Sequence, residues 1–199
     1  QPMPLVITLA HQKGGVGKST LASNLRAYFS QAYKTALVDI DPQGSLTKLA
    51  KAFSEQEGRD SEHVISRTDF ASFKELHEKI SGYDVVIIDT PPYLSTELES
   101  VFALSNIIII PTKTSPLDFL AISDTMELIK THQQNNPLLL AGVVLTMVIS
   151  GTDFTNKIRQ EIEKTDFHVF SAEIGNRVAY MRSLLKGNSV EADDSKKAW

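Results

Sequence analysis

The chain has 199 residues, a formal net charge of −4 at pH 7, 42% hydrophobic residues and no cysteine. This composition is typical of one soluble globular domain, and it excludes cysteine-ligated clusters, thiolate zinc sites and cysteine nucleophiles. The acidic balance argues against a general affinity for nucleic acid. We therefore expect a single domain over residues 1–199 that lies in the cytoplasm and has no membrane partner.

Six short apolar runs predict β-strands at 5–10, 35–40, 83–89, 106–112, 138–148 and 168–174. Most of them are continuous rather than alternating, which is typical of parallel strands covered on both faces. The runs alternate with helical segments, so the sequence predicts an α/β fold. We expect a single-domain, doubly wound, mostly parallel sheet with helices on both faces and a ligand beyond the carboxyl ends of the strands.

Two stripes of apolar residues recur at helical spacing, and we expect both to be core. The first consists of Leu21, Leu25, Tyr28, Phe29 and Ala32, and the second of Leu117, Leu120, Ala121, Met126 and Leu128 or Ile129. The polar interval 54–69 lies between predicted strands that are both continuous apolar runs. It is interpreted as a surface loop rather than a domain boundary.

The first predicted strand is followed by the segment HQKGGVGKST. It matches the phosphate-loop pattern G-x-x-x-x-G-K-[ST] at Gly17, Lys18 and Ser19, although Gln12 stands at the first position. Glycines let backbone N–H groups turn toward phosphates, and the helix that follows adds its positive N-terminal end. Lys18 would neutralise the β- and γ-phosphates, and the Ser19 hydroxyl would bind Mg²⁺. The predicted nucleotide-binding residues here are Gly14, Gly15, Val16, Gly17, Lys18, Ser19 and Thr20.

A second lysine, Lys13, precedes the glycines, although a loop for one nucleotide needs only one lysine. The segment KGGVGKST resembles the deviant Walker A motif of the ParA/MinD family of P-loop ATPases, whose signature lysine occupies this place. The resemblance implies that Lys13 acts catalytically across a nucleotide-sandwich homodimer, on the phosphates of the partner's ATP. Two facing loops can exchange lysines to neutralise charge that develops during phosphoryl transfer. A solvated surface lysine is the alternative.

Carboxylates end two more predicted strands. Asp39 and Asp41 are separated by one residue in VDIDPQGSLT, so both side chains can face the same way. In YDVVIIDTPP, Asp89 is the last residue of the predicted strand, where a buried carboxylate needs a partner such as Mg²⁺. These segments resemble the first switch and the Walker B motif of the same family. The resemblance implies that Asp41 orients the attacking water, Asp39 holds metal-bound water and Asp89 joins Ser19 at the metal.

Two segments match the family more loosely. Pro111 lies in IIPTKTSPLDF, which resembles a stretch that borders the nucleotide and continues into a helix at the dimer interface; a simple turn that opens a helix at Pro116 is the alternative. Thr146 in VLTMV would face the adenine. Residues 175–198 resemble the family's closing segment. Relatives have one further helix, so we expect the chain to be truncated or shorter than usual.

The resemblance covers nearly the whole chain and is strongest for compact ParA proteins that lack an N-terminal helix-turn-helix region. It implies an ATP hydrolase that dimerises with ATP and Mg²⁺, binds DNA nonspecifically on the nucleoid, and positions plasmid, chromosome or another cargo through a ParB-type adaptor. Arg177, Arg182 and Lys186 are the candidate DNA contacts, with an ordinary solvated face as the alternative.

Two other functions stay open. A MinD-like membrane-associated positioning ATPase would end in an amphipathic helix, and EADDSKKAW has no apolar face. A metabolic P-loop ligase would share the phosphate loop but would need neither Lys13 nor the segment that contains Asp41.

Overall fold

The computed structural model describes residues 2–11, 13–44, 46–48, 63–92, 95–149 and 153–175. These residues form a seven-stranded sheet in the order β3-β2-β4-β1-β5-β6-β7, and every neighbouring pair is parallel. The strands are β1 (Leu5–Leu9), β2 (Thr35–Asp39), β3 (Val64–Ser66), β4 (Val85–Asp89), β5 (Ile107–Thr112), β6 (Leu140–Val148) and β7 (Val169–Gly175). The predicted parallel α/β fold and its six predicted strands are confirmed.

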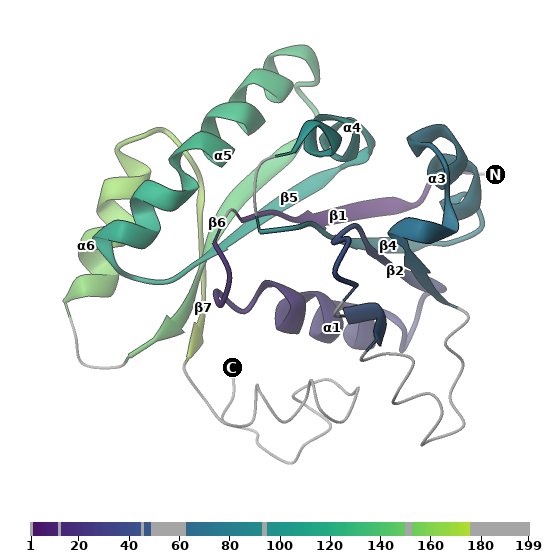
Figure 1. Cartoon of the computed structure of the whole chain (residues 1–199). Helices are drawn as coiled ribbons and strands as arrows, with labels where there is room; N and C mark the ends of the chain where they lie inside the picture. The colour runs from purple at the N-terminus through teal and green to yellow at the C-terminus, as the bar shows by residue number, and fades with distance from the viewer. Residues whose placement is uncertain are drawn as a thin grey trace.

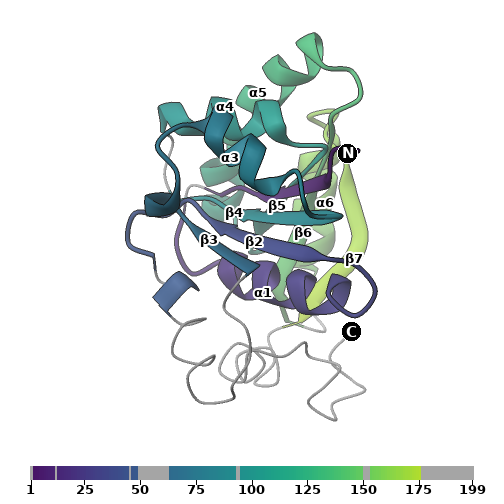
Figure 2. The same ribbon diagram turned by 90° about the vertical axis from the view of Figure 1, so that its right-hand side faces the viewer.

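Helices cover both faces of the sheet, as predicted. They are α1 (Lys18–Phe29), α3 (Phe73–Ile80), α4 (Thr96–Leu104), α5 (Pro116–Asn135) and α6 (Phe154–Glu163), with a short 3₁₀ helix, η2, at Arg67–Asp69. In Figures 1 and 2, α1 lies under one face, while α3, α4 and α5 lie over the other. No helix among the described residues is long and apolar enough to cross a membrane.

The core has one apolar cluster on each face of the sheet. Adjacent strand residues point to opposite faces, so Val6 belongs to the cluster under α3 to α6, whereas Ile7 belongs to the cluster over α1. Val86 and Ile87 divide in the same way. Strands buried on both faces therefore require continuous apolar sequence, which is why the runs do not alternate.

The predicted helical stripes are only partly core. Leu21, Met126 and Ile129 are buried, but Tyr28, Leu117 and Leu120 are 55%, 71% and 64% exposed. Leu117 and Leu120 lie outside the buried side of α5. That side has helical spacing and consists of Asp118, Ile122, Thr125, Met126 and Ile129. Ala32 is also exposed, because it follows the end of α1.

The last residues of the interval 54–69, interpreted above as a surface loop, form regular secondary structure instead. Val64–Ser66 forms β3 and pairs in parallel with β2, with Asp39 opposite Ser66. Three residues are too short to show a periodic pattern, so the pairing could not be predicted from the sequence. Residues 54–62 lie outside the described ranges.

Candidate nucleotide-binding site

The three predicted motifs meet at one edge of the sheet. β4 lies between β1 and β2, and its last residue, Asp89, stands opposite both Leu9 of β1 and Asp39 of β2. All three strands are parallel, so their carboxyl ends, and the segments that follow them, share this edge. The fold therefore brings together the glycine-rich loop and the aspartates that the sequence predicts.

The loop from Lys13 to Gly17 has the backbone that a phosphate cradle requires. Gly15 and Gly17 have φ angles of 75° and 82°, in the left-handed region that favours glycine. α1 starts at Lys18 with neither a side-chain cap nor an acidic residue in its first turn. A helix N-terminus without such partners presents free N–H groups and the positive end of its dipole, and this fits a phosphate group.

Lys18 and Ser19 converge on Asp89. Lys18 Nζ donates a hydrogen bond to Asp89 Oδ1 at 2.6 Å and another to the Thr90 carbonyl oxygen, while Ser19 Oγ donates to Asp89 Oδ2 at 2.7 Å. Burial raises the pKa of Asp89, against the opposing effects of Lys18 and Ser19, and nearby Asp39 raises it further. A hydroxyl beside a carboxylate is a fitting donor pair for Mg²⁺, which takes its other ligands from phosphate and water.

The two aspartates at the end of β2 organise the segment that follows. Asp39 is buried; its Oδ1 accepts the Asp41 N–H at 3.1 Å, and its Oδ2 accepts the N–H and hydroxyl of Thr47 at 3.0 and 2.9 Å. Asp41 Oδ1 accepts the Gln43 N–H at 2.9 Å and closes a local turn. The roles of Asp39 at the metal and of Asp41 at the attacking water stay predictions.

The structure gives Lys13 a partner on α5 of its own chain. Its Nζ donates to Asp118 Oδ1 at 2.9 Å, and the side chains of Lys13 and Asp118 are 45% and 4% exposed. Burial would raise the pKa of Asp118, but hydrogen bonds from Lys13 and Ser115 and the charges of Lys13 and Lys113 bring it below its usual value. Lys13 is therefore held at the rim of the loop, separate from the Lys18 pair.

His11 is a buried residue that the sequence did not single out. Its Nδ1 accepts the Lys13 backbone N–H at 2.7 Å, which leaves the proton of a neutral ring on Nε2. Its pKa is lowered to about 4, chiefly by burial; Asp118 acts in the opposite direction, and the charges of Lys18 and Lys13 add to the lowering. Among the described residues, Nε2 is buried without a hydrogen-bond partner. A lone histidine before a glycine-rich loop gave no signal for this contact.

The start of α5 fixes the residue that holds Lys13. Ser115 caps the helix by accepting the Asp118 N–H at 3.2 Å, Pro116 takes the first helical position, and Ser115 Oγ donates to Asp118 Oδ2 at 2.5 Å. The proline-opened helix is confirmed. Pro111 is buried in β5, and its contact with a nucleotide stays a prediction.

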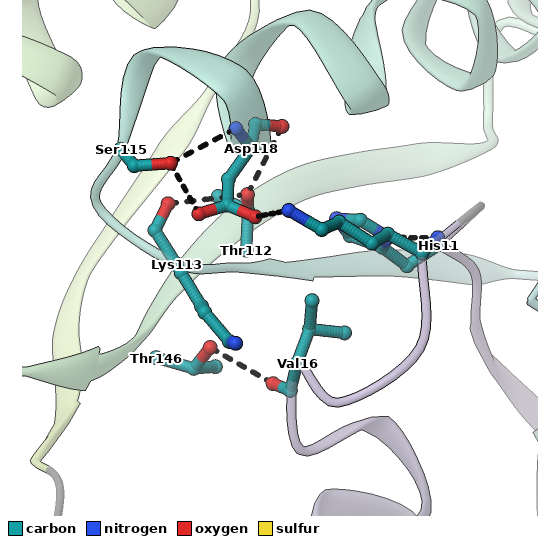
Figure 3. Close-up of polar contacts among 8 residues, drawn as sticks. His11, Val16, Thr112, Lys113, Ser115, Asp118 and Thr146 are labelled. Carbon is teal, nitrogen blue, oxygen red and sulfur yellow. Dashed lines mark hydrogen bonds and ion pairs between the residues drawn. The ribbon is translucent and has the colours of Figure 1, made fainter.

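Thr146 lies beside the glycine-rich loop and contacts it directly. It is 2% exposed, and its Oγ1 donates to the Val16 carbonyl oxygen at 2.9 Å (Figure 3). The hydroxyl therefore holds the glycine-rich loop against β6, and the expected contact of Thr146 with adenine stays a prediction. Met147, the next residue, has a φ of 52°, which an L-residue rarely adopts.

The predicted DNA contacts Arg177, Arg182 and Lys186 lie outside the described residues. Three other basic residues of this end of the chain, Lys157, Arg159 and Lys164, are described, and the last two form ion pairs. Arg159 pairs with Glu173 at 2.7 Å and Lys164 pairs with Glu161 at 2.6 Å.

Comparison with known proteins places these features in a family. Residues 7–190 match the model of the CobQ/CobB/MinD/ParA nucleotide binding domain. The chain is 36% identical over 190 residues to the maintenance of carboxysome distribution protein A of Gloeobacter kilaueensis, covering 94% of this chain and 84% of that protein. It is 29% identical over 203 residues to the sporulation initiation inhibitor protein Soj of Bacillus subtilis, covering 81% and 80%.

Solved structures share the fold. The apo structure of McdA from Cyanothece superposes with a TM-score of 0.75 at 16% identity, covering 98% of this chain and 94% of that one. Cobyrinic acid a,c-diamide synthase from Mycobacterium smegmatis, solved with ADP and magnesium, gives a TM-score of 0.72 at 24% identity, covering 97% and 94%. At these identities the likeness concerns the fold alone.

Proposed function

The chain belongs to the CobQ/CobB/MinD/ParA family and is a ParA-type ATPase, and from that premise we propose that it is an ATP-dependent positioning switch. It forms a homodimer on binding ATP and Mg²⁺, and that dimer binds DNA nonspecifically. Hydrolysis of ATP then separates the subunits and releases the DNA. The cargo is a plasmid, a chromosome or a protein assembly, reached through a ParB-type adaptor.

One observation supports this proposal most strongly: the two lysines of the loop have separate places. Lys18 is 8% exposed and bound to Asp89, whereas the Lys13 side chain is 45% exposed at the rim and bound to Asp118 of α5. A cation at the rim can reach a neighbouring molecule, while a buried one serves its own site. These positions support a role in trans for Lys13 and a role in cis for Lys18.

Within each subunit, Lys18 would hold the β- and γ-phosphates, and Ser19 with Asp89 would hold Mg²⁺. ATP with its bound metal supplies the phosphoryl group and a cation that neutralises charge in its transfer. Asp39 would then set the position of the 41–47 segment, as its bonds to Asp41 and Thr47 do here. Asp41 would orient the attacking water.

Exposed apolar side chains at the carboxyl edge of the sheet give the dimer a surface. Leu117 and Leu120 at the start of α5 are 71% and 64% exposed, and Phe154 at the start of α6 is 59% exposed. Both helices follow strands that end at the loop's edge of the sheet, so these residues flank the side from which Lys13 emerges. Exposed apolar patches of this kind mark interaction surfaces.

The cargo step is supported by the name of a relative. That relative is named for the maintenance of carboxysome distribution, which is the placement of a cargo. With a net charge of −4, the monomer should bind DNA weakly. A dimer that pools Arg177, Arg182 and Lys186 from two subunits would bind only when ATP is present.

Light scattering and ATPase assays of the Lys13→Gln variant test this proposal. We expect the variant to bind ATP as the wild type does, to stay monomeric with ATP and Mg²⁺, and to lose turnover. Lys18→Ala is the comparison, and it should lose ATP binding itself. Normal dimers and an unchanged ATPase rate in Lys13→Gln would show that Lys13 is only a surface residue.

A further inference from the structure

Lys113 is a third lysine beside the glycine-rich loop. It follows β5 directly, in the turn that leads to α5, and is half-buried. A Cβ atom placed on Gly15 would lie 4.0 Å from Lys113 Nζ. In Figure 3 the side chain runs from the start of α5 toward Val16 and Thr146, away from the Asp118 carboxylate. The ammonium group therefore approaches the middle of the loop.

Among the described residues, Lys113 has no carboxylate in direct contact, although its charge acts on Asp118 from a distance. Lys13 is paired with Asp118, and Lys18 is paired with Asp89. Within the described ranges of the chain, the Lys113 ammonium has neither an ion-pair partner nor a hydrogen-bond acceptor. Two of the three ammonium groups are thus neutralised by carboxylates of the chain, and the third is available to an anion from outside it.

The groups around the Lys113 ammonium favour a phosphate over other anions. Gly15 has a φ of 75° in a loop that leads to an uncapped helix N-terminus, and such a loop directs N–H groups toward phosphate oxygens. A lysine ammonium is a compact, strongly hydrated charge that favours phosphate oxygens over neutral hydroxyl or carbonyl groups. Lys113 and the N–H groups near Gly15 would therefore bind the same oxygens.

We propose that Lys113 is a nucleotide-binding residue that contacts the polyphosphate of ATP or ADP in its own subunit. This inference rests on the proposed nucleotide site and adds to it a cation from the β5–α5 turn. Its role differs from that of Lys13, because Lys113 acts in cis and before dimerisation. It should therefore contribute to the affinity of a monomer for ADP.

Titration calorimetry of the full chain with ATP, ADP and inorganic tripolyphosphate tests the inference. Lys113→Met should weaken all three by about tenfold, the size expected for one charge-assisted hydrogen bond, and less so at high salt. Lys113→Arg keeps the charge and should retain most of the affinity. Lys74→Met, the same change at an exposed lysine of α3, is the matched control and should bind as the wild type does.

Several results would overturn the inference. If Lys113→Met binds all three ligands normally while Lys18→Ala binds none, the loop is a nucleotide site without Lys113. If only ATP and ADP weaken and tripolyphosphate does not, Lys113 contacts the nucleoside instead. An equally weakened Lys113→Arg together with a lowered melting temperature of the ligand-free variants would assign the lysine to the fold. If Lys18→Ala also binds normally, the proposed nucleotide site itself fails.

Discussion

At the scale of one residue, His11 beside the glycine-rich loop makes folding stability depend on pH. Its imidazole is 2% exposed and accepts the Lys13 N–H, so the folded chain holds the neutral ring. Burial lowers the pKa from 6.5 to about 4. Below pH 6.5 the unfolded chain takes up a proton that the folded chain refuses, so folding stability falls as the pH falls from 6.5 toward 4.

We predict that His11→Asn removes this part of the pH dependence. Between about pH 7.5 and pH 5, the wild type should lose about 2 kcal/mol more free energy of unfolding than the variant. Asparagine can still accept the Lys13 N–H, so the loop keeps its contact. Urea unfolding at both pH values measures the difference. Parallel losses in the two proteins would show that His11 does not titrate as a buried group.

The sequence was informative about residues whose chemistry is local. Gly17, Lys18 and Ser19 lie in one short motif, and Asp89 ends an apolar run. Asp118 was missed because its partner Lys13 is 105 positions away in the sequence. The placement of Lys113 beside Gly15 likewise depends on β5 pairing with β1. Such contacts are set by strand order, which no local pattern encodes.

At the scale of elements, continuous apolar runs predicted six strands because each lies in a sheet covered on both faces. β3 was missed because its three residues are too few to show a periodic pattern. On α5, helical periodicity predicted Leu117 and Leu120 as core, yet both are exposed. Periodicity identifies an apolar side of a helix but does not tell whether the helix's own chain or another molecule covers it.

We predict that Leu120→Glu prevents ATP-dependent dimerisation without destabilising the monomer. Leu120 is 64% exposed, so a charge there costs the fold little, but it would be buried against a partner in the dimer. The melting temperature should change little, while light scattering with ATP and Mg²⁺ should find monomers. Glu127→Leu, at an exposed position further along α5, serves as a control on the same helix. Dimers of normal affinity would remove this face from the interface.

The substitution Gly142→Ala tests how tightly β6 packs against the aromatic rings of β7 and the residue before it. A Cβ atom at this position would lie 2.7 Å from Phe170 Cε2 and 3.0 Å from His168 Cδ2, and these two rings pack edge to face. Gly142→Ala should therefore lower the free energy of unfolding by about 1–3 kcal/mol through overpacking. Gly82→Ala, whose nearest neighbour is Lys34 Nζ at 3.9 Å, is the control. Equal stability of the two variants would contradict the packing.

At the scale of the whole molecule, the net charge bears on the proposed binding of DNA. The monomer carries −4, so strong binding requires the basic residues of two subunits on one face. For about three to five phosphate contacts, log K should fall with log salt at a slope of roughly −0.9 per contact, whatever the base sequence. Arg182→Glu should weaken ATP-dependent binding to every duplex and leave ATP affinity unchanged, as measured by fluorescence anisotropy. A stable variant with the wild-type affinity and salt slope would remove Arg182 from the DNA surface.

The central claim is that Lys13 acts on the nucleotide of the partner subunit. Mixing two inactive variants tests it directly: Asp41→Ala keeps Lys13 but lacks its own water-orienting carboxylate, and Lys13→Gln keeps Asp41 but lacks the lysine. In a mixed dimer of a two-fold assembly, one site receives Asp41 from its own chain and Lys13 from the partner. Lys13→Gln alone should stay monomeric, but a mixed dimer keeps one exchanged lysine and holds one complete site of two, so an equimolar mixture should recover turnover up to about a quarter of the wild-type ATPase rate. A mixture no faster than the average of its two components would contradict the claim and assign Lys13 to its own subunit.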